Sequence, residues 1–250
     1  MDFQKTITTS KDLSRALGSE PHSGSALLPF SQEQDFRELY SYFKNKSVAI
    51  VGPSPHLIGE NRGKDIDEYD IVCKVGHHYR IKNADDYGKR IDVLFNGCFP
   101  DCYTVEEYGG HNIKKIICPI KTCIPGIRDV HNRDIYGFYS KLKEYHKDID
   151  FNTIGLFLCD MDHKIGTRAL LGSCAVAFLL EMDLEELGIY GFTWFSEGEP
   201  CSSDYNKQYR DTNEKISNPH GCPLKPEVTY IKKMIEGSSY KVYATPLVPL

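Results

Sequence analysis

The sequence predicts an α/β protein: a single Rossmann-like domain whose mostly parallel central sheet is flanked by helices, as in a GT-A-like variant. Short apolar runs bounded by turn residues alternate along the chain with longer segments of helical periodicity. This alternation is typical of β-α-β units, because parallel strands need a crossover between them. No repeat or linker interrupts it, so we expect one domain over residues 31–250, preceded by a polar arm over residues 1–30.

The strands are predicted from their short apolar runs. Buried parallel strands are covered on both faces and therefore read as continuous apolar segments rather than alternating ones. The predicted strands are residues 48–51, 71–74, 93–96, 115–118, 153–159, 187–192 and a final short one near 240–244.

The helices are predicted from apolar spacing. In residues 32–44, Phe36, Leu39, Tyr40 and Phe43 recur at helical intervals. The segment 167–182, TRALLGSCAVAFLLEM, is the most apolar, and its small residues suit close packing on a sheet. The remaining predicted helices are residues 134–146 and 227–236, with a short one near 11–17 in the arm.

The composition excludes several classes of function. A net charge of −5 argues against nonspecific binding of nucleic acid, which needs a basic surface. The chain has no apolar run near the ~20 residues of a membrane span, and its start has no apolar signal-peptide core. We therefore expect a cytoplasmic protein, or one that has lost an anchor.

The nine cysteines do not suggest a metal site or a disulfide framework. Their number is odd, and none of them forms a CxxC pair. Several lie in apolar runs such as IVCKV and LFLCD. We expect reduced, buried thiols.

Ligands of an open parallel sheet bind where its strands end. Three segments are expected to meet there: Gly52-Pro53-Ser54, Phe95-Asn96-Gly97 and the start of the 167–182 helix. A helix N-terminus suits a phosphate, so Thr167 and Arg168 either bind one or serve as an N-cap and a solvated charge.

Two further features suggest chemistry. His220 lies in NPHGCPLKPE, a rigid loop before the last helix, and is either a general base or a surface histidine. Asp160-Met161-Asp162 follows a predicted strand and is either a divalent-metal site or an accident of sequence. The P-loop and nucleophile-elbow motifs are absent, which argues against a P-loop NTPase and an α/β-hydrolase.

Four segments in order resemble the motifs of the sialyltransferases. Residues 48–75 resemble the first long motif, a strand, a G-N-S turn and then G-K-E-I-D-x-x-D-x-V, and share with it Gly52, Ser54, Gly63, Lys64, Ile66, Asp67, Asp70 and Val72. Residues 85–96, DDYGKRIDVLFN, resemble the D-x-G-x-[KR]-T stretch that follows. Residues 166–195 resemble the second motif, and residues 218–234 the last one, in which a histidine precedes an acidic residue and a helix. The resemblance extends over most of the chain.

The resemblance implies an inverting, metal-independent glycosyltransferase that moves a sugar, sialic acid in that family, from a CMP-sugar to a glycan acceptor and needs no cofactor. His220 would be the catalytic base. The nucleotide would be held by Gly52, Pro53, Ser54 and Asn96, and the leaving phosphate by Thr167, Arg168, Ser173 and Tyr205. Such an enzyme would lie in the Golgi lumen only if an N-terminal anchor is missing.

The chain also departs from the motifs. Pro53 and Gly76 replace asparagines, Lys74 replaces an arginine, and Val48 replaces the half-cystine of animal members. Asp204-Tyr205-Asn206 replaces a His-Tyr-Tyr, and Lys225 lies at the expected acidic position, with Glu227 two residues further on. Alternatives therefore stay open: a CMP-Kdo transferase or a nucleotide hydrolase with the same fold, or a non-catalytic nucleotide-binding protein.

Overall fold

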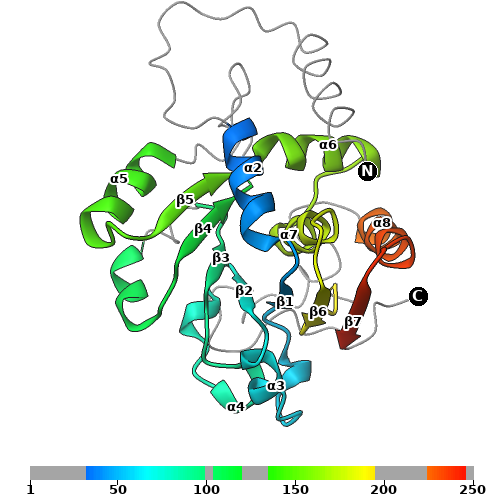
Figure 1. Cartoon of the computed structure of the whole chain (residues 1–250), viewed down its shortest axis with the longest axis horizontal. Coiled ribbons are helices and arrows are strands. Elements are labelled where there is room, and N and C mark those ends of the chain that lie inside the picture. Colours follow the sequence, from blue (N-terminus) through cyan, green and yellow to red (C-terminus); the bar gives the residue numbers. More distant parts are fainter. Residues whose placement is uncertain (1–31, 99–103, 120–134, 195–223, 246–250) are drawn as a thin grey trace, which may run out of the picture.

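The computed structural model describes residues 32–98, 104–119, 135–194 and 224–245. Seven strands form one sheet in the order β5-β4-β3-β2-β1-β6-β7 (Figure 1), and every neighbouring pair is parallel. The Rossmann-like α/β fold class predicted from the sequence is therefore confirmed. The predicted arm over residues 1–30 lies outside the described residues.

Six of the seven strands lie close to the predicted positions. β1 lies at the centre, between β2 and β6, and its residues Val48 to Val51 are fully buried, as their apolar sequence predicts. The strands are β1 Ser47–Val51, β2 Ile71–Val75, β3 Val93–Phe95, β4 Lys115–Cys118, β5 Asp150–Thr153, β6 Glu186–Tyr190 and β7 Lys241–Thr245.

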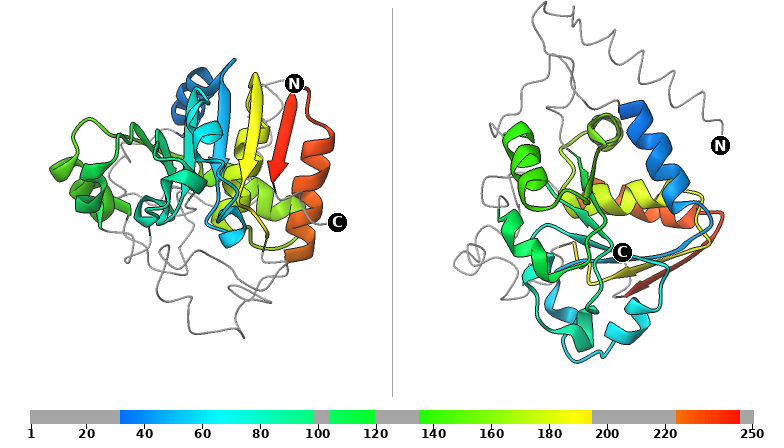
Figure 2. Two further views of the ribbon diagram at one scale, coloured as in Figure 1. Left: turned by 90° about the horizontal axis from the view of Figure 1, so that it is seen from below. Right: turned by 60° about the vertical axis from the view of Figure 1, so that its left-hand side comes forward.

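Helices cover both faces of the sheet. On one face, α2, α6, α7 and α8 join a core with β1, β2, β3 and β6. On the other face, α5 packs with β3, β4 and β5, and α3 and α4 pack under β1 and β2. Figure 2 shows α8 beside β7 at one edge of the sheet and α5 at the other. The α-helices are α2 Gln32–Phe43, α3 Gly63–Asp67, α4 Ala84–Tyr87, α5 Ile135–Tyr145, α6 Gly155–Ile165, α7 Leu171–Leu180 and α8 Leu224–Glu236.

The prediction of a strand over residues 153–159 is wrong. The strand β5 ends at Thr153, and α6 begins at Gly155. Leu158, Met161 and Ile165 recur at helical intervals and are the positions that α6 buries, so packing favours a helix over a strand. Asp35 of α2 covers the outer edge of the strand at its end, where it accepts hydrogen bonds from the Thr153 N–H and hydroxyl, both at 2.9 Å.

The helix predicted over residues 167–182 begins later, at Leu171, because α6 and its left-handed terminal glycine, Gly166, occupy the preceding residues. The last helix begins earlier than predicted, at Leu224. Short helices α3 and α4 form where the sequence suggested only loops. In the described part of the chain, no helix is long and apolar enough to cross a membrane.

Candidate functional site

The strand order places a switch point between β1 and β6. From β1 the chain adds β2 to β5 in one direction, and β6 and β7 then extend the sheet on the other side of β1. Open α/β sheets bind ligands at such a point, beyond the carboxyl ends of the strands. The segments that emerge there are Gly52-Pro53-Ser54 after β1 and Gly191 to Trp194 after β6.

These two segments lie in backbone contact. The Gly52 N–H donates to the Tyr190 carbonyl at 2.7 Å, and the Ser54 N–H donates to the Gly191 carbonyl at 3.1 Å. A Cβ atom on Gly52 would lie 2.5 Å from the Gly191 oxygen, and Gly191 has a φ of +67°. The turn after β1 therefore needs glycine on both segments.

Side chains from the segment after β2 hold the carbonyls of the same turn. The Tyr87 hydroxyl donates to the Ser54 carbonyl at 2.7 Å, and Nε2 of His78 lies 3.2 Å from the Gly52 carbonyl oxygen. A carbonyl only accepts, so Nε2 carries the proton. Burial, and secondarily the nearby Lys74, lowers the pKa of His78 well below its usual value and keeps the ring neutral. The Gly52–Ser54 turn is thus held at both carbonyls.

The sequence alone did not single out His78. No partner for it lies nearby in the sequence, and the Gly52 carbonyl that it contacts is 26 residues away. Ser54 itself is buried, and its hydroxyl accepts from the His56 N–H at 3.3 Å. Pro53, which lies between Gly52 and Ser54, is partly buried.

Asn96 lies after β3 and is fully buried. Its amide nitrogen donates to the Tyr108 hydroxyl at 2.9 Å, and its amide oxygen accepts from the Cys98 N–H at 2.7 Å. Both ends of the side chain therefore make internal hydrogen bonds, and its contact with a nucleotide remains a prediction.

Ser173 lies in the first turn of α7 and faces Trp194. The Trp194 indole N–H donates to the Ser173 hydroxyl at 3.0 Å. Glu227 of α8 is fully buried nearby and accepts from the Leu170 N–H at 3.1 Å. Burial raises the pKa of Glu227 to about 7. The hydrogen bonds that it accepts from the Ser173 hydroxyl and the Leu170 N–H act in the opposite direction but are the smaller effect. Segments from β6, α7 and α8 thus meet at this point.

Thr167 and Arg168 do not begin a helix, contrary to the prediction. They lie between α6 and α7, and α7 is capped by Leu170 without a side-chain hydrogen bond. The N–H groups of Ala169 and Leu170 already donate to carboxylates, those of Asp162 and Glu227. Free helix N–H groups at Thr167 therefore do not form the phosphate site that we expected, although Ser173 keeps its place in the first turn of α7.

The Asp160-Met161-Asp162 segment is not at a strand end. It lies within α6, where Asp160 pairs with Lys164 at 2.6 Å and Asp162 accepts from the Ala169 N–H at 2.6 Å. Met161 is buried in the core. Among the residues that the structure describes, no group of three or more His, Cys, Asp or Glu side chains is arranged to hold a metal ion.

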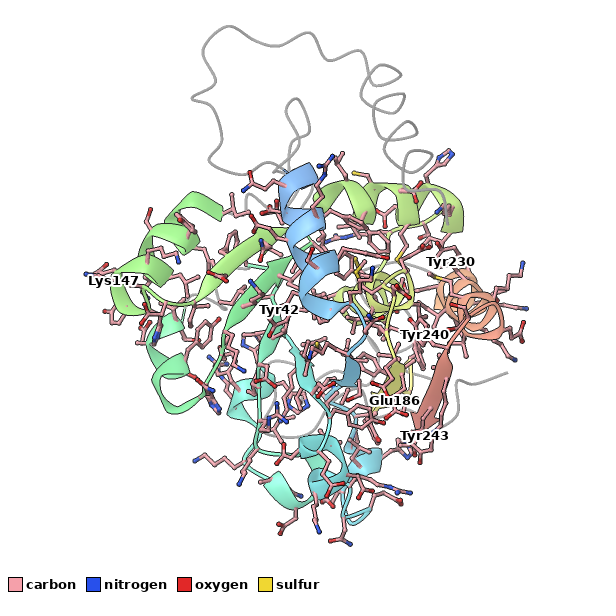
Figure 3. All side chains as sticks on the ribbon, in the orientation of Figure 1. Tyr42, Lys147, Glu186, Tyr230, Tyr240 and Tyr243 are labelled. Atoms are coloured by element: carbon pink, nitrogen blue, oxygen red, sulfur yellow. The ribbon has the colours of Figure 1, made fainter. Side chains whose placement is uncertain are left out.

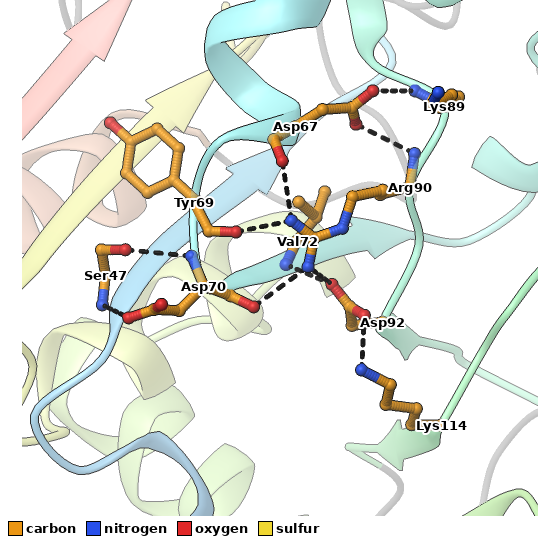
Figure 4. Close-up of polar contacts among 9 residues, drawn as sticks. All are labelled: Ser47, Asp67, Tyr69, Asp70, Val72, Lys89, Arg90, Asp92 and Lys114. Atoms are coloured by element: carbon orange, nitrogen blue, oxygen red, sulfur yellow. Dashed lines mark hydrogen bonds and ion pairs between the residues drawn. The ribbon is translucent and has the colours of Figure 1, made fainter.

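The GKDID segment, which carries much of the resemblance, lies away from the switch point. Asp67 of α3 accepts from the N–H groups of Lys89 and Arg90 at 3.1 and 3.0 Å. The Arg90 guanidinium donates to the carbonyls of Asp67, Tyr69 and Asp70 and pairs with Asp92 at 2.8 Å (Figure 4). Asp70 and Asp92 immediately precede β2 and β3. These motif residues therefore join the amino ends of the strands.

His220 and Tyr205, which we predicted as base and phosphate ligand, lie outside the described residues. Lys74, at the position of the expected arginine, is buried and donates to the Gly88 carbonyl at 2.6 Å. Burial lowers its pKa to about 8, opposed by the charge of Asp67.

No protein-family profile and no curated protein sequence matches this chain. Solved structures do. The sialyltransferase CstII from Campylobacter jejuni, in complex with the substrate analogue cytidine-5'-monophosphate, is 12% identical with a TM-score of 0.51, over 80% of each chain. The monofunctional alpha-2,3-sialyltransferase Cst-I from Campylobacter jejuni is 16% identical with a TM-score of 0.52, over 80% of this chain and 75% of the other. CST-II in complex with a trisaccharide acceptor and CMP is 14% identical with a TM-score of 0.50, over 80% of each chain.

Proposed function

We propose that this chain is an inverting glycosyltransferase that moves sialic acid from a CMP-sugar to a hydroxyl group of a glycan. One observation carries the proposal: the Gly52–Ser54 turn lies at the switch point of a fold that the chain shares with solved sialyltransferases. The sequence motifs occur in the same order and support it independently of the fold.

The similar structures contain the two classes of ligand that this site would take. CstII was solved in complex with cytidine-5'-monophosphate, and CST-II in complex with a trisaccharide acceptor and CMP. We propose that the corresponding partners here are a CMP-sugar donor and a glycan acceptor. The nucleotide would lie against the turn after β1 and the segment after β3, where Asn96 is found.

The turn after β1 is suited to a rigid nucleotide contact. His78 and Tyr87 already bind its carbonyls, and Gly191 binds the Ser54 N–H. A pre-organised backbone loses little conformational entropy when a ligand binds, which favours affinity. A nucleotide that binds over Gly52, Pro53 and Ser54 would therefore meet a turn whose backbone is already fixed.

In the proposed reaction, His220 takes the proton of the acceptor hydroxyl while that oxygen attacks the anomeric carbon. The new carbon–oxygen bond forms on one face as the bond to the CMP phosphate breaks on the other, so the configuration inverts. The departing phosphate gains negative charge and needs hydrogen-bond donors. The proposed donors are Tyr205, Thr167 and Arg168, and Ser173 once its hydroxyl turns from Glu227 to the phosphate. No metal takes part.

The proposal is tested by measuring CMP release from CMP-sialic acid, with and without a galactoside acceptor and with EDTA. We expect release that the acceptor stimulates, that EDTA does not reduce, and that His220→Ala lowers by a factor of about 100 or more. His163→Ala is the matched control, since His163 is an exposed histidine near the end of α6 and should leave the rate unchanged.

The same assay separates the alternatives. Release from CMP-Kdo but not from CMP-sialic acid would indicate a different donor, and release without any need for an acceptor would indicate a hydrolase. CMP binding by calorimetry without turnover would indicate a non-catalytic nucleotide-binding protein. No binding of CMP at millimolar concentration would refute the proposal altogether.

A further inference from the structure

Two cysteines on neighbouring strands bring their sulfur atoms into contact. Cys98 follows β3, and Cys118 is the last residue of β4. Their Sγ atoms lie 3.3 Å apart, and both residues are fully buried in the core that α5 covers. From this contact we propose that Cys98 and Cys118 are an oxidation site, a dithiol that forms a disulfide in the folded protein.

The backbone holds the two thiols in register. β3 and β4 are parallel with Phe95 opposite Ile117, and the Asn96 N–H donates to the Ile117 carbonyl at 3.0 Å. Beyond Asn96, the chain turns back so that Cys98 reaches the end of β4. The position of Cys98 is therefore set by the ladder between the two strands and by the turn that follows it.

The turn at Cys98 is itself held in an uncommon conformation. Cys98 has a φ of +48°, a region that residues other than glycine rarely occupy. The Asn96 side-chain oxygen accepts from the Cys98 N–H at 2.7 Å, and the Asn96 amide is anchored in turn by Tyr108. These bonds direct the Cys98 side chain toward Cys118.

Bond formation needs only a small movement. A disulfide has a sulfur–sulfur distance of about 2.05 Å, so the sulfurs must approach by little more than 1 Å. With a peroxide as oxidant, one thiol becomes a sulfenic acid and releases water. The second thiol then attacks that sulfur and releases another water, so two thiols and one peroxide give one disulfide and two waters. With a small-molecule disulfide, two exchanges give the same bond and two released thiols.

The new bond would tie the segment after β3 to β4. That segment begins with Asn96, whose amide already holds Cys98. Oxidation would therefore make the turn at residues 96–98 part of a covalent loop closed at Cys118, and it would resist local opening. This consequence does not depend on the proposed activity.

The test is tryptic mass spectrometry of the native full-length protein after treatment with hydrogen peroxide or oxidised glutathione. Trypsin leaves Cys118 alone in the peptide 116–121 and Cys98 in the peptide 91–114, which also contains Cys102. The experiment is therefore done in a Cys102→Ala background. We expect a linked pair of these peptides that a reductant abolishes, and a rise in Tm of a few degrees, ~2–6 °C, on oxidation.

Cys174→Ala is the matched control. Cys174 is equally buried, but it packs in the core on the other face of the sheet. The linked peptide should persist in this variant and vanish in Cys98→Ser. A link from Cys118 to Cys174, or a link that forms only after denaturation, would overturn the proposal.

Discussion

Gly52 shows how close the segments after β1 and β6 lie. Its missing side chain is what lets the Gly191 carbonyl approach, and the Phe192 ring would also lie within 3.0 Å of an added Cβ. The sequence motif G-x-S marked this glycine as a turn residue. The contact that requires glycine at this position is with the Gly191 carbonyl, 139 residues further along the chain in the segment after β6.

Glu227 combines full burial with a carboxyl group. Its one backbone donor, the Leu170 N–H, compensates only part of the cost of placing a charge in the core. The pKa of Glu227 is about 7 in the folded state, against an ordinary 4.5, so the folded protein keeps this proton up to a higher pH than the unfolded chain does. Stability contributed by the protonated form is present below pH 4.5 and is lost as the pH rises to about 7.

We therefore expect Glu227→Gln to become more stable relative to the wild type as the pH rises from 5 to 8. The glutamine keeps an oxygen for the Leu170 N–H but has no proton to lose. The relative gain in the free energy of unfolding should be up to about 3 kcal/mol, measured by urea denaturation at each pH. Glu236→Gln, at the exposed end of the same helix, is the control and should show little change with pH. Parallel pH curves for wild type and Glu227→Gln would contradict the assignment.

The helix α3 and the turn before β3 form a polar junction at the amino edge of the sheet. Arg90 binds three carbonyls and the buried Asp92 carboxylate, and Asp92 also accepts from the Val72 N–H at 3.0 Å and pairs with Lys114. The Ser47 N–H and hydroxyl join this junction through Asp70. Residues of the first sialyltransferase-like motif and of the stretch that follows it thus align the starts of β1, β2 and β3.

We expect Arg90→Met to lower the free energy of unfolding by roughly 2–4 kcal/mol. The substitution removes the Arg90 hydrogen bonds to three carbonyls and to the Asp92 carboxylate, and losing hydrogen bonds to a charged group is costly. The measurement is chemical denaturation at neutral pH. Arg80→Met is the control, because Arg80 makes a partly exposed ion pair with Glu107, and such pairs contribute less than about 1 kcal/mol. Equal losses of unfolding free energy in the two variants would show that the junction stabilises the fold no more than an exposed ion pair does.

The central strand β1 and the edge strand β7 differ in how well their backbones are shielded from solvent. β1 is paired on both sides and wholly buried from Val48 onward, whereas β7 lies at the edge of the described sheet, where it pairs with β6 and with no other described strand. Tyr243 of β7 is 38% exposed, and Figure 3 shows it on the outer strand, away from the helices α7 and α8. The centre and this edge therefore differ in the contacts that oppose local opening.

We expect this asymmetry to appear in amide hydrogen exchange. The amides of Ala49 and Ile50 should exchange at least about 100-fold more slowly than those of Tyr243 and Thr245, which face β6, because edge strands open without global unfolding. Exchange of the native protein followed by mass spectrometry or NMR measures the two rates. Equal protection of both strands would mean that β7 opens only when the whole sheet unfolds.

The local pattern was sufficient for most elements. Strands β1, β2 and β4 were predicted within a residue, because a fully buried parallel strand is a continuous apolar run with clear ends. The pattern failed at residues 153–159, where an apolar segment fits a strand or a helix equally well. Packing against the sheet selects the helix α6 over a strand for this segment. Because α6 extends to Ile165, α7 begins at Leu171 and not at Thr167.

For the candidate site, the sequence predicted the Gly52–Ser54 turn and Asn96, since turn residues after apolar runs mark the carboxyl ends of strands, and the resemblance to the sialyltransferases added Ser173. The strand order decided that Gly52 and Gly191 share a switch point. Tertiary contacts also revealed His78 and Tyr87 behind the turn, the buried Glu227 beside α7 and the sulfur contact of Cys98 with Cys118. Local sequence specifies which segments are strands and turns. Side-chain contacts between residues 20 or more positions apart depend on how those strands pack against one another, so the residues next to each partner in the sequence do not predict them.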